Sequence, residues 1–123
     1  LMPLTMMNAS GKELQDRKIV VENTLVVYDD IYLPLGRMRL RARGGAGGHN
    51  GMQSCLQAVQ SEALPRLRVG VGDPDARCDM KTFVLSAFTK QEEPSVKAMV
   101  ERAADACEAW INEGIHVAMN RYN

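Results

Sequence analysis

One segment of this chain, Arg37–Gly51, combines charge and spacing in a way that indicates a ligand. Its arginines recur at every second position, so a β-strand would carry all of their guanidinium groups on one face. They are Arg37, Arg39, Arg41 and Arg43. The glycines that follow let backbone N–H groups approach a bulky anion closely. The pattern predicts a surface that binds phosphate, with nucleic acid as the first candidate; a solvated strand face that protects a sheet edge is the alternative.

Two further groups of polar side chains have types suited to catalysis. Asp29 and Asp30 follow a short apolar run, and carboxylates at the end of a strand act as bases, as metal ligands or as groups that orient a histidine. A solvated turn is the alternative. His49 could move a proton, although a lone loop histidine more often packs or forms hydrogen bonds. Asn50 is expected to cap a helix that starts at the next residue, so that its amide and the helix N-terminus face the same space.

Strand and helix patterns alternate around these residues. Short apolar or alternating runs are expected to be strands, and amphipathic stretches are expected to be helices. The apolar stripe of the last helix, which includes Val100, Trp110 and Ile111, is expected to lie in the core. This alternation predicts an α/β sandwich with a mostly parallel or mixed sheet. The expected strands are Thr24–Tyr28, the arginine run and Arg66–Gly72, and the expected helices are Met52–Val59 and a long one that Gly114 ends.

Composition narrows the class of protein. A chain of 123 residues is expected to form a single domain over residues 1–123. Its 15 basic and 15 acidic residues balance, so any attraction for nucleic acid must be local. The 3 cysteines are widely spaced without a metal-ligand pattern, and buried thiols in a reducing compartment are expected. We expect no metal, no cofactor and no membrane segment.

Five short sequence blocks, spread over nearly the whole chain, carry a resemblance to a known family. The blocks are Met6–Lys12, Tyr28–Asp30, Leu33–Gly36, Gly44–Gly51 and Pro65–Gly72. In order and spacing they resemble the bacterial-type peptidyl-tRNA hydrolases, and GGHNG together with RLRVGVG is the most specific pair. The resemblance implies a monomer with a three-layer α/β sandwich and a mixed central sheet, here lacking its first strand. It also implies hydrolysis of the ester between a peptide and the 3′ end of tRNA, which recycles tRNA in translation.

The resemblance further implies roles for individual residues. The family uses a histidine as general base on the attacking water, and Asp29 matches the aspartate that orients this histidine. Asn8 and Asn50 match the asparagines that hold the peptide and the tRNA end, with Met6 at a neighbouring substrate contact. Amides suit this task because they can donate to a carbonyl and accept from a peptide N–H at once. The residues expected near the acceptor-stem phosphates are Arg37, Arg39, Arg41 and Arg43.

The chain also departs from the family pattern. The family's first strand, its Gly-Asn-Pro-Gly turn and the Thr-Arg-His-Asn segment with the catalytic histidine do not occur in the sequence, and neither His49 nor His116 replaces that histidine. The helix after Ser10 is short and lacks an apolar face. Tyr32 and Asp73 stand where the family commonly has an aspartate and a basic residue. The chain alone is therefore expected to be inactive, as a fragment, a splice variant or a degenerated paralogue.

Two hypotheses of function follow from the resemblance. In the first, the chain is part of an enzyme that cleaves peptidyl-tRNA; in the second, it is a binding protein that keeps the RNA-facing surface without hydrolysis, similar to the plant organellar splicing factors of this fold. Asp29 with the two asparagines favours the first hypothesis, and Tyr32 with the missing histidine segment favours the second. The protein would be cytoplasmic, or in an organelle matrix if a transit segment was removed. An unpaired sheet edge would promote association between chains.

Overall fold

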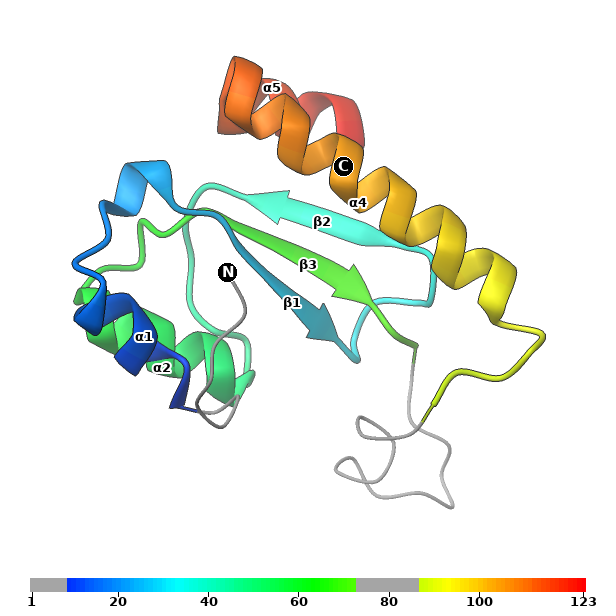
Figure 1. Ribbon diagram of the computed structural model, residues 1–123, viewed down its shortest axis with the longest axis horizontal. Helices are drawn as coiled ribbons and strands as arrows, with labels where there is room; N and C mark the ends of the chain where they lie inside the picture. The colour runs from blue at the N-terminus through cyan, green and yellow to red at the C-terminus, as the bar shows by residue number, and fades with distance from the viewer. Residues whose placement is uncertain (1–8, 73–86) are drawn as a thin grey trace. The chain divides into compact units, whose positions relative to one another are not determined.

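The computed structural model describes residues 9–72 and 87–123. Within them, β1 (Val26–Asp30), β2 (Met38–Arg41) and β3 (Arg66–Gly70) form a sheet in the order β1-β3-β2. In Figure 1, β1 and β3 point the same way and β2 points the opposite way, so the sheet is mixed, as the sequence predicts. The chain divides into two compact units, which are described separately: Leu1–Tyr28 with Arg41–Arg66, and Asp29–Leu40 with Leu67–Asn123.

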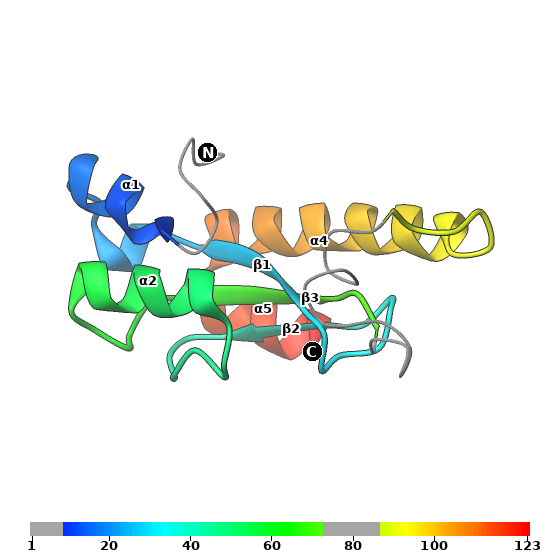
Figure 2. The ribbon, with the colours of Figure 1, turned by 90° about the horizontal axis from the view of Figure 1, so that it is seen from below.

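The first unit is built around α2 (Asn50–Val59). Its buried residues include Met52, Cys55 and Leu56, the positions that the amphipathic spacing predicts. The helix α1 (Gly11–Asp16) lies alongside α2 (Figure 2). The two helices approach so closely that the Gly11 N–H donates to the Ser54 Oγ at 2.9 Å, and a Cβ at Gly11 would overlap the Ser54 backbone. Cys55 is free and 4% exposed, so it is a core residue, as expected, and burial raises the pKa of its thiol. Cys107 is only half-buried, and Cys78 lies outside the described residues.

A short 3-10 helix, η2 (Val21–Asn23), leads from α1 into β1. The strand then starts where the Val26 N–H donates to the Pro65 carbonyl at 3.0 Å, and both Val26 and Tyr28 pack against the core beneath α2. This core consists of residues that are almost fully excluded from solvent. They are Ala46, Met52, Cys55, Leu56 and Leu64.

The second unit contains the long helix α4 (Glu93–Glu113) and a helix that the sequence did not predict, α5 (Ile115–Tyr122). Pro94 lies in the first turn of α4, and the helix ends, as predicted, at Gly114, which has φ of 90°. The two helices pack together, and the Arg102 guanidinium lies 5.1 Å from the centre of the Tyr122 ring. No helix in the described part of the chain is long and apolar enough to cross a membrane.

The interpretation of the α4 stripe was wrong in part. Val100 and Ile111 are 58% and 71% exposed, and the buried residues of this helix are Met99, Ala106 and Ala109. The helical period defines the apolar face, but the width of the buried stripe depends on the neighbour that covers it. Two of the three buried residues are alanines, and α5 packs against α4.

The Asn123 side chain forms hydrogen bonds with the backbone of Leu40 at the outer edge of β2. The Asn123 side-chain amide donates to the Leu40 carbonyl at 2.9 Å, and its oxygen accepts from the Leu40 N–H at 2.6 Å. A side-chain amide thereby makes the pair of hydrogen bonds that a neighbouring strand would make. This contact satisfies the backbone groups of Leu40 at the edge of β2, and the expected association of chains through an unpaired sheet edge stays a prediction.

Candidate functional site

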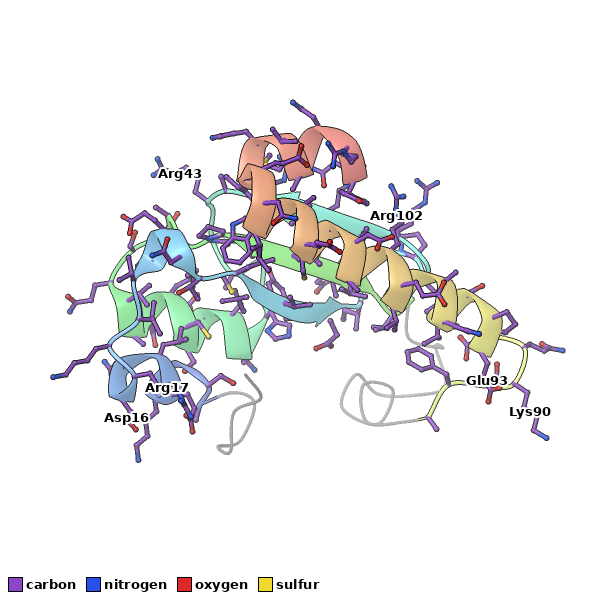
Figure 3. All side chains as sticks on the ribbon, turned by 45° about the horizontal axis from the view of Figure 1, so that its top comes forward. Asp16, Arg17, Arg43, Lys90, Glu93 and Arg102 are labelled. Carbon is purple, nitrogen blue, oxygen red and sulfur yellow. The ribbon has the colours of Figure 1, made fainter. Side chains whose placement is uncertain are left out.

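The alternation predicted for the arginine segment is present in β2. Met38 and Leu40 are buried, whereas Arg39 and Arg41 between them are exposed. Arg37 just before the strand and Arg43 just after it are also exposed, and Figure 3 shows Arg43 extending away from the ribbon. None of these arginines forms a salt bridge with a described residue, because the ion pairs in residues 9–72 and 87–123 involve other side chains. Within this part of the chain no carboxylate pairs with them, an arrangement that suits the binding of an external anion.

A glycine loop, residues 42–49, leads from β2 into α2. Gly47 and Gly48 have φ of 59° and 85°, a region that other residues rarely adopt. The His49 N–H donates to the Ala46 carbonyl at 3.1 Å and closes the turn. The loop therefore ends in a defined conformation directly before the first helical residue, Asn50, whose side chain is exposed.

His49, and not Asn50, caps α2. The His49 Nδ1 accepts the Met52 N–H at 3.0 Å, and Asn50 is the first residue of the helix. The expectation that Asn50 caps the helix is wrong because the imidazole already satisfies an N-terminal N–H group. The His49 ring also packs against Tyr28, with ring centroids 4.6 Å apart and planes inclined by 54°. With Nδ1 accepting a hydrogen bond, the neutral ring carries its proton on Nε2. This arrangement matches the packing and hydrogen-bonding alternative for His49.

Asp29 and Asp30 are the last two residues of β1, not the first residues after it. Successive side chains of a strand point to opposite faces, so the two carboxylates do not share a role. Asp30 is only 8% exposed, which rules out the solvated turn that the sequence allowed. Its Oδ2 accepts from the Arg68 Nη1 at 3.0 Å, and its Oδ1 accepts from the Tyr32 N–H at 2.8 Å. Asp30 is a structural carboxylate, and Asp29, which is partly buried, is the candidate for chemistry.

The turn after the aspartates is held by the end of β3. The Gly70 N–H donates to the Arg37 carbonyl at 2.7 Å, and the Gly72 N–H donates to the Leu33 carbonyl at 3.1 Å. The Val71 N–H donates to the Asp30 carbonyl at 3.2 Å. These bonds fix the segment that connects Asp29 to the arginine strand.

Sequence reasoning missed Arg66. This arginine is 2% exposed and is among the largest fully buried side chains of the described residues. It donates hydrogen bonds to the carbonyls of Gly45, Glu62 and Leu64. The available signal was an arginine at the start of an apolar strand, but its partners come from other parts of the chain and leave no local pattern.

The predicted site residues fall in different parts of the molecule. His49, Asn50, Arg41 and Arg43 belong to the first unit, and Asp29, Arg37 and Arg39 belong to the second. Met6 and Asn8 lie outside the described residues. Among the residues that are described, no group of three or more His, Cys, Asp or Glu side chains could hold a metal ion.

Comparison with known proteins decides the family. A family model described as peptidyl-tRNA hydrolase matches residues 1–123. The chain belongs to the peptidyl-tRNA hydrolase family. The peptidyl-tRNA hydrolase of Alkaliphilus metalliredigens is 45% identical over 125 residues, which cover 98% of this chain and 67% of that protein. The peptidyl-tRNA hydrolase of a Synechococcus strain is 46% identical over 127 residues, which cover 100% of this chain and 57% of that protein.

The fold is also that of solved peptidyl-tRNA hydrolases. The crystal structure of the Acinetobacter baumannii enzyme superposes with a TM-score of 0.85 at 27% sequence identity, over 98% of this chain and 63% of that one. The α/β class with a mixed central sheet, predicted from the sequence, is therefore confirmed. The chain spans 57% to 67% of the length of these hydrolases.

Proposed function

We propose that the protein acts on peptidyl-tRNA, whose ester between the peptide and the tRNA 3′ end the family hydrolyses, and that residues 1–123 bind this substrate. The observation that carries the proposal is the row of exposed arginines on and beside β2, which the glycine loop and α2 follow along the chain. Membership of the peptidyl-tRNA hydrolase family over residues 1–123 supports it.

Charge and geometry give the arginines a defined role in this proposal. Arg39 and Arg41 share one face of β2, so their guanidinium groups follow one another along the strand. Guanidinium groups without internal carboxylate partners bind phosphate oxygens bidentately. Arg37 precedes the strand and Arg43 follows it, and the two residues extend the row of arginines. We assign these arginines to the phosphates of the acceptor stem.

Asn50, at the start of α2, would contact the acylated end of the tRNA. Asn50 lies in the first turn of α2, where backbone N–H groups and its own amide are available to a peptide or to the terminal ribose. Asn8 and Met6 would complete this contact. Asp29 would orient the catalytic histidine and stabilise its charged form.

The general base is not assigned to a histidine of this sequence. The 123 residues include 2 histidines; His49 caps α2 through Nδ1, and His116 lies in α5. Neither belongs to a Thr-Arg-His-Asn segment. We infer that these residues alone bind the substrate and do not turn it over. Turnover of an N-acylated aminoacyl-tRNA that depends on His49 would contradict this inference, whereas binding without turnover also fits the RNA-binding hypothesis.

The arginine row can be tested by its effect on tRNA binding. Replacing Arg39 and Arg41 together with alanine should weaken binding of uncharged tRNA by about tenfold or more, because two phosphate contacts are lost. The slope of log K against log salt should fall by about two for the same reason. Fluorescence anisotropy over a series of salt concentrations measures both quantities.

A matched control removes the same charge elsewhere. Lys90, which precedes α4, and Lys97, which lies within it, are exposed, and replacing both with alanine lowers the net charge equally. This variant should bind tRNA within about twofold of the unmodified chain, since long-range charge effects are screened at moderate salt. Equal weakening by the two double variants would show a general charge effect and would contradict the arginine site.

A further inference from the structure

The buried arginine at the start of β3, Arg66, is bonded on all of its guanidinium nitrogens. The Nη1 donates to the Gly45 carbonyl at 2.7 Å, the Nε donates to the Leu64 carbonyl at 3.0 Å, and the Nη2 donates to the Glu62 carbonyl at 3.0 Å. Burial of an arginine that is 2% exposed costs free energy of folding unless its N–H donors form hydrogen bonds. The planar guanidinium can donate to several carbonyls that lie in different directions.

The carbonyls bonded by Arg66 belong to two separate segments. Glu62 and Leu64 lie in the stretch that precedes β3, whereas Gly45 lies in the glycine loop. The Gly44 N–H also donates to the Glu62 carbonyl at 2.9 Å. The first half of the glycine loop is thus fastened to the segment before β3 by a network centred on one side chain.

The second half of the loop depends on this fastening. Between Gly45 and α2 the chain contains Gly47 and Gly48, whose backbones have the most conformational freedom when nothing holds them. The loop is fixed at one end by Arg66 and at the other by the His49 cap on the Met52 N–H. Losing either fixed point would let the first turn of α2 fray.

We propose that Arg66 is a positioning residue, which holds the glycine loop so that Asn50 and the N-terminus of α2 are presented to the acylated end of the tRNA. This proposal rests on the proposed function above. Arg66 is buried and acts through the loop, without contacting the substrate. The alternative is that Arg66 only stabilises the fold, and the two roles differ in what a substitution does to ligand discrimination.

The test compares Arg66→Lys with Leu64→Ala. A lysine has one compact ammonium, which cannot reach the carbonyls of Gly45, Glu62 and Leu64 together. Leu64 is 0% exposed, so Leu64→Ala removes core packing but leaves the Leu64 carbonyl in place for Arg66. Both variants are expected to lose stability, and only Arg66→Lys releases the loop.

The readouts are hydrogen exchange and the binding of two RNA probes. The probes are a minihelix RNA with an amide-linked N-acetylaminoacyl group, which cannot be hydrolysed, and the same minihelix uncharged. Arg66→Lys should speed exchange of the Gly44 and His49 amides and weaken binding of the acylated probe by about tenfold, with uncharged binding kept within about twofold. Leu64→Ala should leave the ratio of the two affinities unchanged.

The outcomes separate this proposal from the proposed function. Unchanged discrimination between the probes in Arg66→Lys, or equal loss of discrimination in Leu64→Ala, would overturn the positioning role. If the unmodified chain binds neither probe, the proposed function fails, while the exchange of the Gly44 and His49 amides still tests whether Arg66 holds the loop. Should Arg66→Lys not fold, Arg66→Met and the exchange rate of the Arg66 Nε–H in the unmodified chain provide the test, and fast exchange of that proton would overturn the proposal.

Discussion

Gly70→Ala should lower the free energy of unfolding by about 3 kcal/mol or more. A Cβ at Gly70 would overlap the Pro34 carbonyl oxygen and would lie 2.9 Å from the carbonyl oxygens of Leu33 and Arg37. Backbone atoms cannot rotate away as a side chain can, so the turn after β1 would have to move. Its displacement would break the hydrogen bond from the Gly70 N–H to the Arg37 carbonyl, which is 2.7 Å long.

Gly45→Ala is the matched control for this prediction. A Cβ at Gly45 would meet no atom within 4 Å, and its backbone does not have a positive φ. The substitution should change the unfolding free energy by less than about 1 kcal/mol, with a small gain because alanine restricts the unfolded chain. Urea unfolding followed by circular dichroism measures both variants. Equal midpoints for Gly70→Ala and Gly45→Ala would contradict the packing described for the end of β3.

Asp30→Ala should destabilise the protein by about 3 kcal/mol, because it breaks a largely buried ion pair. Asp30 accepts hydrogen bonds from the Arg68 Nη1 and the Tyr32 N–H at 3.0 Å and 2.8 Å. The Arg68 Nε is already buried without a hydrogen-bond partner among the described residues, so the guanidinium has little other compensation. Asp30→Asn keeps an acceptor for the Tyr32 N–H, and we expect it to lose less stability than the alanine variant.

An exposed ion pair of this chain provides the control. Glu113 and Arg121 form a contact of 2.7 Å, with side chains that are 43% and 50% exposed. Solvent screens this pair, so Glu113→Ala should cost much less stability than Asp30→Ala. Thermal or urea unfolding of the two alanine variants makes the comparison. An Asp30→Ala variant as stable as Glu113→Ala would show that the Asp30 pair does not hold the turn after β1.

Local sequence patterns were sufficient to predict the helices and strands that bury one regular face. The alternation of β2 and the apolar positions Met52, Cys55 and Leu56 of α2 follow directly from the sequence. The end of the long helix at Gly114 follows from the preference of glycine for positive φ. The α/β class and the mixed sheet followed from the order of these elements together with the family resemblance.

Features that depend on partners distant in the sequence could not be predicted in this way. Asparagine is the better helix cap by preference, yet His49 caps α2, where its ring also packs on Tyr28. The carboxylate of Asp30 forms an ion pair with Arg68, which lies 38 positions away in the sequence. The bonding of Arg66 could not be predicted because its acceptors are backbone carbonyls, which every residue has.

The assignment of Asn50 to the acylated end is tested most directly by equilibrium binding of the acylated and uncharged minihelix probes to the unmodified chain and to Asn50→Ala. Asn50 is exposed in the first turn of α2, so its removal should leave the fold intact. We expect the unmodified chain to bind the acylated probe about tenfold more tightly than the uncharged one, and we expect Asn50→Ala to remove this preference while it keeps the affinity for uncharged RNA. Equal binding of the two probes by the unmodified chain, or a preference that survives in Asn50→Ala, would contradict it.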